Sequence, residues 1–293
     1  RDNFTQMVKK IGPQNFELHQ DLRNKYRLYL EPALTSSYIR INMKDPLLGK
    51  NKYLRKALAT AYNVEKSIDL LRSGRGVKLY SIVPRSIYGS EDEIGQFGYN
   101  YNLEKAKEYL KKAGYPGGKG LPPIELTLSG STSSSKDYFE FIRNSFSEIG
   151  VQLKGDFKTW TAFLKSTENA DFQLASSAWG ADYPDPENFY MLFYGPNKPP
   201  GQNSSGFENE AFDRLYEKMR FMENSPERVA MIKEMAAILQ EEVPVIFDYS
   251  PLSSGLIQSW VRNFKRNAMI SGPFEYFNIE KIKPQKTIED QNT

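Results

Sequence analysis

The sequence predicts a mixed α/β fold, chiefly from the spacing of apolar residues between residues 124 and 178. Apolar residues alternate with polar ones over 124–129 and 151–157, as in half-buried strands. After each of these segments, apolar residues recur at the three- and four-residue spacing of amphipathic helices. Two successive strand–helix–strand units favour parallel strands joined by right-handed crossovers. A mixed sheet flanked by helices is therefore expected.

The other elements are predicted from the same periodicities and from helix-end residues. Strands are expected near 38–43, 124–129, 151–157, 171–178 and 243–249, and helices near 54–61, 64–71, 102–113, 139–149, 160–165, 212–222 and 226–243. Asn63 and Asn102 are suited to cap helices, because an asparagine side chain accepts a hydrogen bond from a free backbone N–H of the first turn. Pro226 suits the first position of the last helix, where no N–H donor is needed.

A long loop is predicted from Trp179 to Phe207, a stretch that contains five prolines. Loops of this length without regular structure are uncommon, and they are usually functional or disordered. Beyond Pro251 the periodic pattern weakens, and roughly the last ten residues are polar enough to predict a disordered tail.

Composition limits the classes of protein that the chain can represent. Its 293 residues carry a formal charge of +3 from 39 basic and 36 acidic residues, without long runs of one sign. This balance predicts a solvated surface of mixed sign, and no nucleic-acid partner is expected. Cysteine is absent, and the single histidine, His19, lies in a polar stretch, so we expect no disulfide and no metal site.

The ends of the sequence and its apolar runs also carry information. No apolar run approaches the roughly 18 residues that a membrane-spanning helix requires. The chain begins at Arg1, and it has no initiating methionine there and neither the basic region nor the apolar segment of a signal peptide. We therefore interpret it as a piece of a longer protein.

The sequence contains no recognisable catalytic motif, and neither catalytic residues nor a cofactor is expected. It lacks a G-x-S-x-G elbow, an H-E-x-x-H helix and a Walker loop. Gly74-Arg75-Gly76 lacks a third glycine and does not follow a strand. The serine-rich stretch 129–135 precedes a helix and could hold an anion there, but a solvated loop with an N-cap is the favoured interpretation.

The segment from Trp179 to Pro186, which reads WGADYPDP, is the strongest candidate for a functional site. It follows a predicted parallel strand at its carboxyl end, where open α/β sheets place their ligands. Two aromatic residues flank Asp182, which suits a ligand with apolar parts around one positive charge. The alternative is that Asp182 and Asp185 are ordinary turn aspartates beside prolines. The residues themselves leave both interpretations open.

This segment resembles the ligand-binding segment of the bacterial extracellular solute-binding proteins of family 5, which include oligopeptide-binding proteins. Three further stretches resemble family motifs in the same order along the chain: 42–48 followed by 54–63, then 101–106 through 113–118, and 241–246. Together the matches extend over roughly residues 35 to 280, and four ordered motifs are more specific than any one of them.

The resemblance implies the carboxy-terminal lobe of a two-lobed periplasmic binding protein, type II-like, with the amino-terminal lobe missing. In peptide-binding members, the aspartate that matches Asp182 pairs with the α-ammonium group of the ligand. Residues that match Ala178, Trp179 and Gly180 run beside the peptide backbone like an added strand. Tyr183 belongs to the same expected site. Residues 1–249 would form the ligand-binding lobe, and residues 250–293 a return segment toward the missing lobe.

The expected function is substrate binding for an ABC importer, without catalysis. The partners would be a peptide ligand and a membrane-embedded ABC permease, for a monomer on the periplasmic or extracellular side of the membrane, with a lipid anchor left open. Some members carry an arginine that helps to hold a ligand carboxylate where this chain has Ser176. The ligand could therefore also be a nickel chelate, a saccharide or an opine. The remaining alternatives are a hydrolase whose catalytic residues lie in the missing part, and a structural or adhesion domain without a small ligand.

Overall fold

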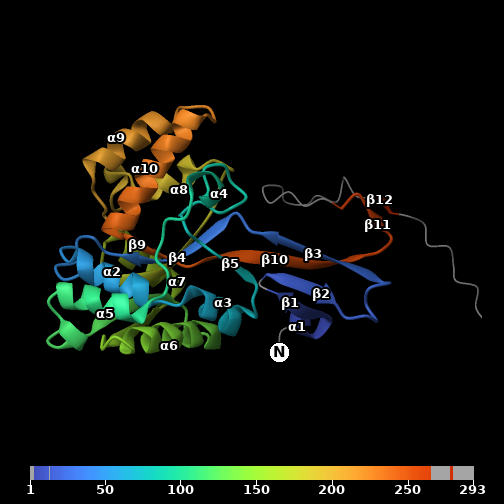
Figure 1. Cartoon of the computed structure of the whole chain (residues 1–293), viewed down its shortest axis with the longest axis horizontal. Helices are drawn as coiled ribbons and strands as arrows, with labels where there is room; N and C mark the ends of the chain where they lie inside the picture. Colours follow the sequence, from blue (N-terminus) through green and yellow to red (C-terminus); the bar gives the residue numbers. More distant parts are fainter. Residues whose placement is uncertain (1–2, 13, 265–277, 280–293) are drawn as a thin grey trace, which may run out of the picture. The chain divides into compact units, whose positions relative to one another are not determined.

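The computed structural model describes residues 3–12, 14–264 and 278–279 and shows a mixed α/β chain (Figure 1). The chain divides into two units: residues 32–252 form the larger, and residues 1–31 and 253–293 belong to the smaller. Within the described residues, no helix combines the length and apolarity needed to cross a bilayer.

The larger unit is built on a five-stranded mixed sheet. Its strand order is β7 (Leu153–Lys158), β6 (Ile124–Ser129), β8 (Leu174–Gly180), β4 (Thr35–Ile41) and β9 (Val245–Phe247). β6 is parallel to both β7 and β8, which confirms the predicted parallel pairing. β4 is antiparallel to β8 and β9 and links the two halves of the sheet.

Alternation along β4 gives the sheet two apolar faces, because successive side chains of a strand point to opposite sides. Ile39 and Ile41 belong to one buried cluster, with the helices α2, α3, α5 and α6. Tyr38 belongs to a second cluster, to which α9 and α10 contribute. Full burial of an isoleucine such as Ile39 is worth about 1.5–3 kcal/mol, so this alternation fixes which face meets which helices.

The helices begin where the sequence places capping residues. Their bounds are α2 Lys52–Ala61, α3 Val64–Arg72, α4 Glu91–Ile94, α5 Leu103–Lys112, α6 Ser133–Ser147, α7 Trp160–Glu168, α8 Glu187–Tyr190, α9 Glu210–Met219 and α10 Pro226–Glu242. The side chains of Asn63 and Asn102 accept hydrogen bonds from backbone N–H groups of the first turns of α3 and α5. Pro226 occupies the first turn of α10, so all three helix-start predictions are confirmed.

Two predicted segments differ in the structure. The expected strand over 243–249 starts only at Val245, because Val243 caps α10 in a left-handed conformation (φ 49°). The stretch 179–207 is not a structureless loop: it contains the short helix α8 and buries Phe189 and Phe193. These aromatic residues join the second cluster, which explains why so many prolines do not leave this stretch unpacked.

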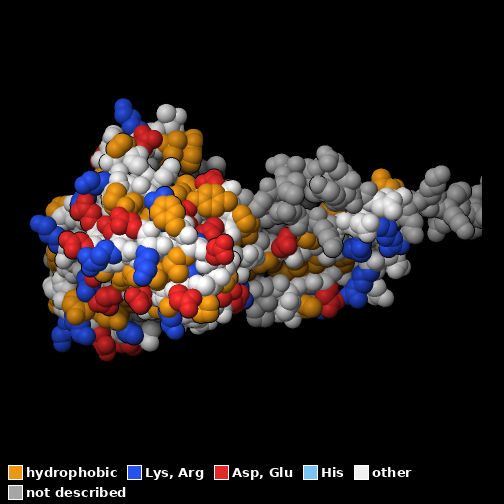
Figure 2. Space-filling view, turned by 90° about the horizontal axis from the view of Figure 1, so that it is seen from above, with side chains coloured by type: hydrophobic (Ala, Val, Ile, Leu, Met, Phe, Trp, Pro, Cys, Tyr) orange, Lys and Arg blue, Asp and Glu red, His pale blue; other side chains and the backbone are white. Residues whose placement is uncertain are grey.

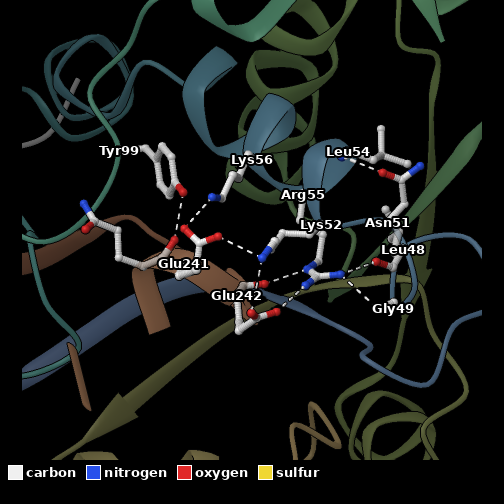
Figure 3. A network of polar contacts seen from close by, with 11 residues as sticks. Leu48, Gly49, Asn51, Lys52, Leu54, Arg55, Lys56, Tyr99, Glu241 and Glu242 are labelled. Carbon is white, nitrogen blue, oxygen red and sulfur yellow. Dashed lines mark hydrogen bonds and ion pairs between the residues drawn. The ribbon is translucent and has the colours of Figure 1, made fainter. Parts of the chain in front are cut away.

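A network of hydrogen bonds and ion pairs joins α2 to the end of α10 (Figure 3). Arg55, which is almost fully buried, donates to the backbone oxygens of Glu242 and Leu48, both at 2.8 Å. Lys52 and Lys56 both pair with the carboxylate of Glu241, at 2.8 Å and 2.6 Å. The backbone carbonyls that a helix end leaves free are thereby partly satisfied, which stabilises this end of α10.

Charges on the larger unit are mixed in sign. Figure 2 shows acidic and basic side chains interspersed over the visible face of this unit, with hydrophobic side chains scattered between them. This distribution agrees with the near balance of charged residues in the sequence.

The smaller unit gives the end of the chain partners that the sequence did not predict. Its described elements are α1 Asn3–Met7, β1 Val8–Gly12, β2 Asn15–Leu18, β3 Tyr26–Pro32, the later part of β10 Tyr249–Gln258, β11 Val261–Arg262 and β12 Asn278–Ile279. β10 pairs through its first residues with β5 (Gly76–Lys78) and neighbours β3 in the same sheet. The expected polar tail lies outside the described residues.

Side chains after Tyr249 contact residues from the beginning of the chain. Leu256 packs against a cluster formed by Phe4, Val8 and Leu18. The ring of Phe264 lies 5.3 Å from that of Tyr29, edge to face. The first 31 residues, whose pattern gave no prediction, supply these partners.

Candidate ligand-binding site

The candidate site lies at the carboxyl ends of β6 and β8. The crossover from β6 runs to β7 on one side, and the crossover from β7 returns past β6 to β8, so the direction of winding reverses between β6 and β8. Such a reversal leaves a crevice at the carboxyl ends of the strands. The fold therefore places the predicted segment, whose first two residues end β8, beside this crevice.

β8 carries an open backbone edge beside this crevice. On one side it pairs with β4 from Leu174 to Gly180. On the other side, β6 pairs only with Leu174 and Ala175. Within the described residues, 176–180 thus have no strand partner on that side. Unpaired backbone N–H and C=O groups at an edge are a template for another extended chain.

A cavity of about 680 Å³ opens along this edge. Hydroxyl groups are frequent among its lining residues, which include Ser37, Ser129, Ser134, Ser135, Ser176 and Ser177. Trp160, Phe163, Leu164 and Trp179 provide apolar walls. The volume falls in the range of small-molecule pockets, and the mixture of hydroxyl and aromatic groups suits a polar ligand with apolar parts.

The five predicted binding residues fall into two groups. Ala178 and Trp179 line the cavity. Gly180, Asp182 and Tyr183 follow them, are exposed, and are not among its lining residues. At Gly180 an added Cβ would meet only the side-chain oxygen of Thr35, at 3.5 Å, so the backbone there is open to close approach.

Asn188, which the sequence analysis did not identify, organises the loop. Its Oδ1 accepts hydrogen bonds from the indole Nε1 of Trp179 and from the backbone N–H of Asp182, both at 3.0 Å. Its Nδ2 donates to the Asp182 carboxylate at 3.3 Å. Asn188 is 1% exposed, so this buried amide holds the cavity wall and the carboxylate in one arrangement. Nothing in its sequence position in α8 distinguishes it.

Asp182 and Asp185 have different environments although they are three residues apart. Asp185 forms a bidentate ion pair with Arg228, at 2.6 Å and 2.9 Å, and also accepts from the backbone N–H of Glu187. The carboxylate of Asp185 is thus already engaged in an ion pair within the protein. Asp182 is exposed, and among the described residues it has no recorded ion pair. Of the two, it is Asp182 that is free to meet a cation.

The inner end of the cavity contains a buried carboxylate. Asp248 accepts hydrogen bonds from the hydroxyl groups of Tyr62 at 3.0 Å and Tyr138 at 2.8 Å. Burial raises the pKa of Asp248 to about 6, although both hydroxyl groups and the nearby charge of Arg72 oppose the shift. Burial also raises the pKa of both tyrosines, so their hydroxyl groups remain donors at neutral pH.

The arrangement defines a class of protein: an α/β lobe with an open strand edge, a polar cavity and an exposed carboxylate is suited to hold an extended small ligand. The model of the bacterial extracellular solute-binding proteins, family 5 (middle region), matches residues 5–201. The chain belongs to this family.

Individual relatives agree with this assignment. The dipeptide-binding protein of Escherichia coli is 26% identical over 254 residues, which are 85% of this chain and 46% of that protein. Heme-binding protein A of Haemophilus influenzae is 28% identical over 80% of this chain and 44% of its own length. A periplasmic binding protein, DppA from Helicobacter pylori in complex with the peptide STSA, superposes with a TM-score of 0.72 at 26% identity, over 89% of this chain and 50% of that one. The chain thus spans about half the length of the relatives it matches.

Proposed function

We propose that this chain forms one of the two lobes of a binding protein that captures a peptide and presents it to an ABC permease. The observation that carries the proposal is the open edge of β8 over residues 176–180, which lies beside a cavity of about 680 Å³. A peptide added at this edge would form backbone hydrogen bonds that do not depend on its sequence.

Asp182 is the proposed partner of the peptide α-ammonium group. At about 4 Å and an effective dielectric constant near 20, such a pair is worth roughly 4 kcal/mol before desolvation is subtracted. Because Asp182 is exposed in this lobe, water screens much of that energy until a second lobe covers the site. Trp179 would supply an apolar wall beside the ligand, with Ala178, Gly180 and Tyr183 completing its surroundings.

Ligand capture would occur by closure of a second lobe over this one, since each lobe contributes only part of the contacts. The relatives' names include peptide-binding and periplasmic proteins, which supports a location on the periplasmic or extracellular side of the membrane. In this proposal the protein is a monomer and has no catalytic activity.

Thermal-shift and calorimetric titration of the two-lobed protein with di- to hexapeptides tests the proposal. We expect stabilisation by peptides with a free amino terminus and no cleavage by mass spectrometry. Because one matched relative is named a heme-binding protein, heme is included in the panel, together with nickel chelates, saccharides and opines. Stabilisation by one of these and by no peptide would replace the peptide assignment, and peptide cleavage would replace binding by catalysis.

A further inference from the structure

Two arginines line the cavity, and they differ in how their charge is balanced. Arg72 is the last residue of α3, and its guanidinium lies 5.0 Å from the centre of the Tyr249 ring. Its charge also acts on the buried carboxylate of Asp248 and partly opposes the rise in the pKa of that group that burial causes. Arg72 is therefore already compensated by an acidic group of the protein.

Among the described residues, Arg40 has no such compensation in an ion pair. It lies in the middle of β4, and its guanidinium carbon is 5.9 Å from the centre of the Tyr38 ring. Its one recorded side-chain hydrogen bond runs to the hydroxyl of Tyr38 at 3.5 Å, the upper limit for such a bond. A guanidinium offers five N–H donors, so most of those of Arg40 are available to a ligand or to water. No ion pair between Arg40 and an acidic side chain is recorded in the described part of the chain.

The acidic residues of the cavity wall do not change this. Of the charged residues that line it, two are acidic: Asp248, which the two tyrosines and Arg72 surround, and Glu168, which is exposed at the end of α7. A half-buried guanidinium that faces a cavity without an acidic partner favours an anionic group in that cavity, since a planar fork of donors matches a carboxylate.

We propose that Arg40 binds a carboxylate of the ligand and thereby selects peptides with a free carboxyl terminus. This inference rests on the proposed function.

Register in the sheet indicates the length of such a peptide. Arg40 lies opposite Ala175 in the β4–β8 pair, whereas Thr35 lies opposite Gly180. At about 3.3 Å per residue, these two levels are about 17 Å apart along β8. An extended peptide advances by the same amount per residue, so one that covers the open edge from Gly180 to Ser176, one level short of Arg40, contains about five residues.

The test compares a peptide acid with its carboxyl-terminal amide in the two-lobed protein. The peptides are the tightest-binding tetra- and pentapeptide captured from an equimolar library and identified by mass spectrometry. Calorimetry should show the amide binding about 10-fold or more weakly than the acid in the wild type. In the Arg40→Gln protein, the affinity for the peptide acid should fall to that for the amide, while the affinity for the amide should not change. Arg40→Lys, which keeps the charge but loses the fork, should restore part of the difference.

Arg220→Gln is the matched control, because Arg220 also lies over a tyrosine ring, that of Tyr216 at 5.4 Å, but does not line the cavity. The Arg220→Gln protein should keep the wild-type ratio of the affinities for the peptide acid and the peptide amide. An Arg40→Gln protein with the wild-type ratio would overturn the role of Arg40 and leave peptide binding intact. If the wild type binds no peptide of either kind, the proposed function fails, and this inference fails with it.

Discussion

The indole Nε1 of Trp179 donates a hydrogen bond of 3.0 Å to the Oδ1 atom of Asn188, and the same oxygen accepts from the backbone N–H of Asp182. One buried amide therefore positions both the apolar wall of the cavity and the carboxylate proposed to meet the ligand. The aromatic and acidic groups of the site are not independent, and changes at Asn188 should affect both.

Asn188→Ala should weaken peptide binding even though Asn188 does not line the cavity. The substitution leaves the Trp179 and Asp182 donors without their acceptor, and an unsatisfied buried donor costs about 1–3 kcal/mol. Part of this cost appears as lost stability and part as a mobile loop, so the dissociation constant should rise several-fold. Calorimetry measures the effect, with Asn203→Ala, a buried asparagine in the same long connection, as the control for stability. An affinity equal to that of the Asn203→Ala protein would contradict the positioning role.

Asp182→Asn should weaken binding of peptides with a free amino terminus by roughly 10-fold or more, because it removes one partner of an ion pair that closure buries. Acetylation of the peptide amino terminus should cause a comparable loss of affinity. When the substitution and the acetylation are combined, their effects on the affinity should not add. An unchanged dissociation constant would mean that Asp182 is only a turn residue.

Asp185→Asn is the matched control in the same loop, and it should affect stability instead. It leaves the guanidinium of Arg228, whose side chain is 3% exposed, without its bidentate partner. We expect a loss of about 2–3 kcal/mol in the free energy of unfolding, less than for a fully buried pair because a third of the Asp185 side chain is exposed. Urea denaturation measures it, and a larger effect on peptide affinity than Asp182→Asn produces would reverse the assignment of the two residues.

Asp248 should make the stability of the larger unit depend on pH. Its pKa is about 6 in the folded protein against 3.8 for the unperturbed group, so the folded state binds this proton more tightly than the unfolded state. Its contribution to stability is therefore greatest below pH 3.8 and is lost as pH rises through 6, by about 3 kcal/mol in total. Asp248→Asn removes this dependence while retaining an acceptor for one tyrosine hydroxyl.

The measurement is urea denaturation of both proteins at several pH values from 4 to 7.5. The difference between the variant and the wild type isolates Asp248, because all other ionisable groups are shared. We expect this difference to move in favour of the variant as pH rises from 4 to 7. If the stabilities of the two proteins changed in parallel with pH, the folded protein would not perturb the pKa of the Asp248 carboxyl group.

This chain alone should bind peptide much more weakly than the two-lobed protein. In the proposed function, the open edge of β8 and the exposed Asp182 supply only one side of the site, and water remains free to compete for both. Calorimetry on the two proteins with the same peptide measures the ratio of their affinities. Comparable affinity would mean that the whole site lies within this lobe.

Local pattern was enough to predict much of the fold. The α/β class, the parallel units around β6, β7 and β8, and the capped starts of α3, α5 and α10 depend on periodicity and on residues adjacent in the chain. The segment Trp179–Pro186 could be selected for the same reason, since its aromatic, acidic and proline residues are consecutive.

Tertiary structure decided everything that depends on residues distant in sequence. β8 has an open edge because its ladder with β6 stops at Ala175, although β6 itself continues to Ser129, and the Asp185 carboxylate is engaged because Arg228 lies opposite it. Arg40 stands in the middle of an ordinary alternating strand, and only the arrangement of the sheet brings it to the cavity wall, where it forms no ion pair with another described residue. A sequence specifies the periodicity of each element directly. Whether a charged side chain is paired depends instead on the neighbours that folding brings to it.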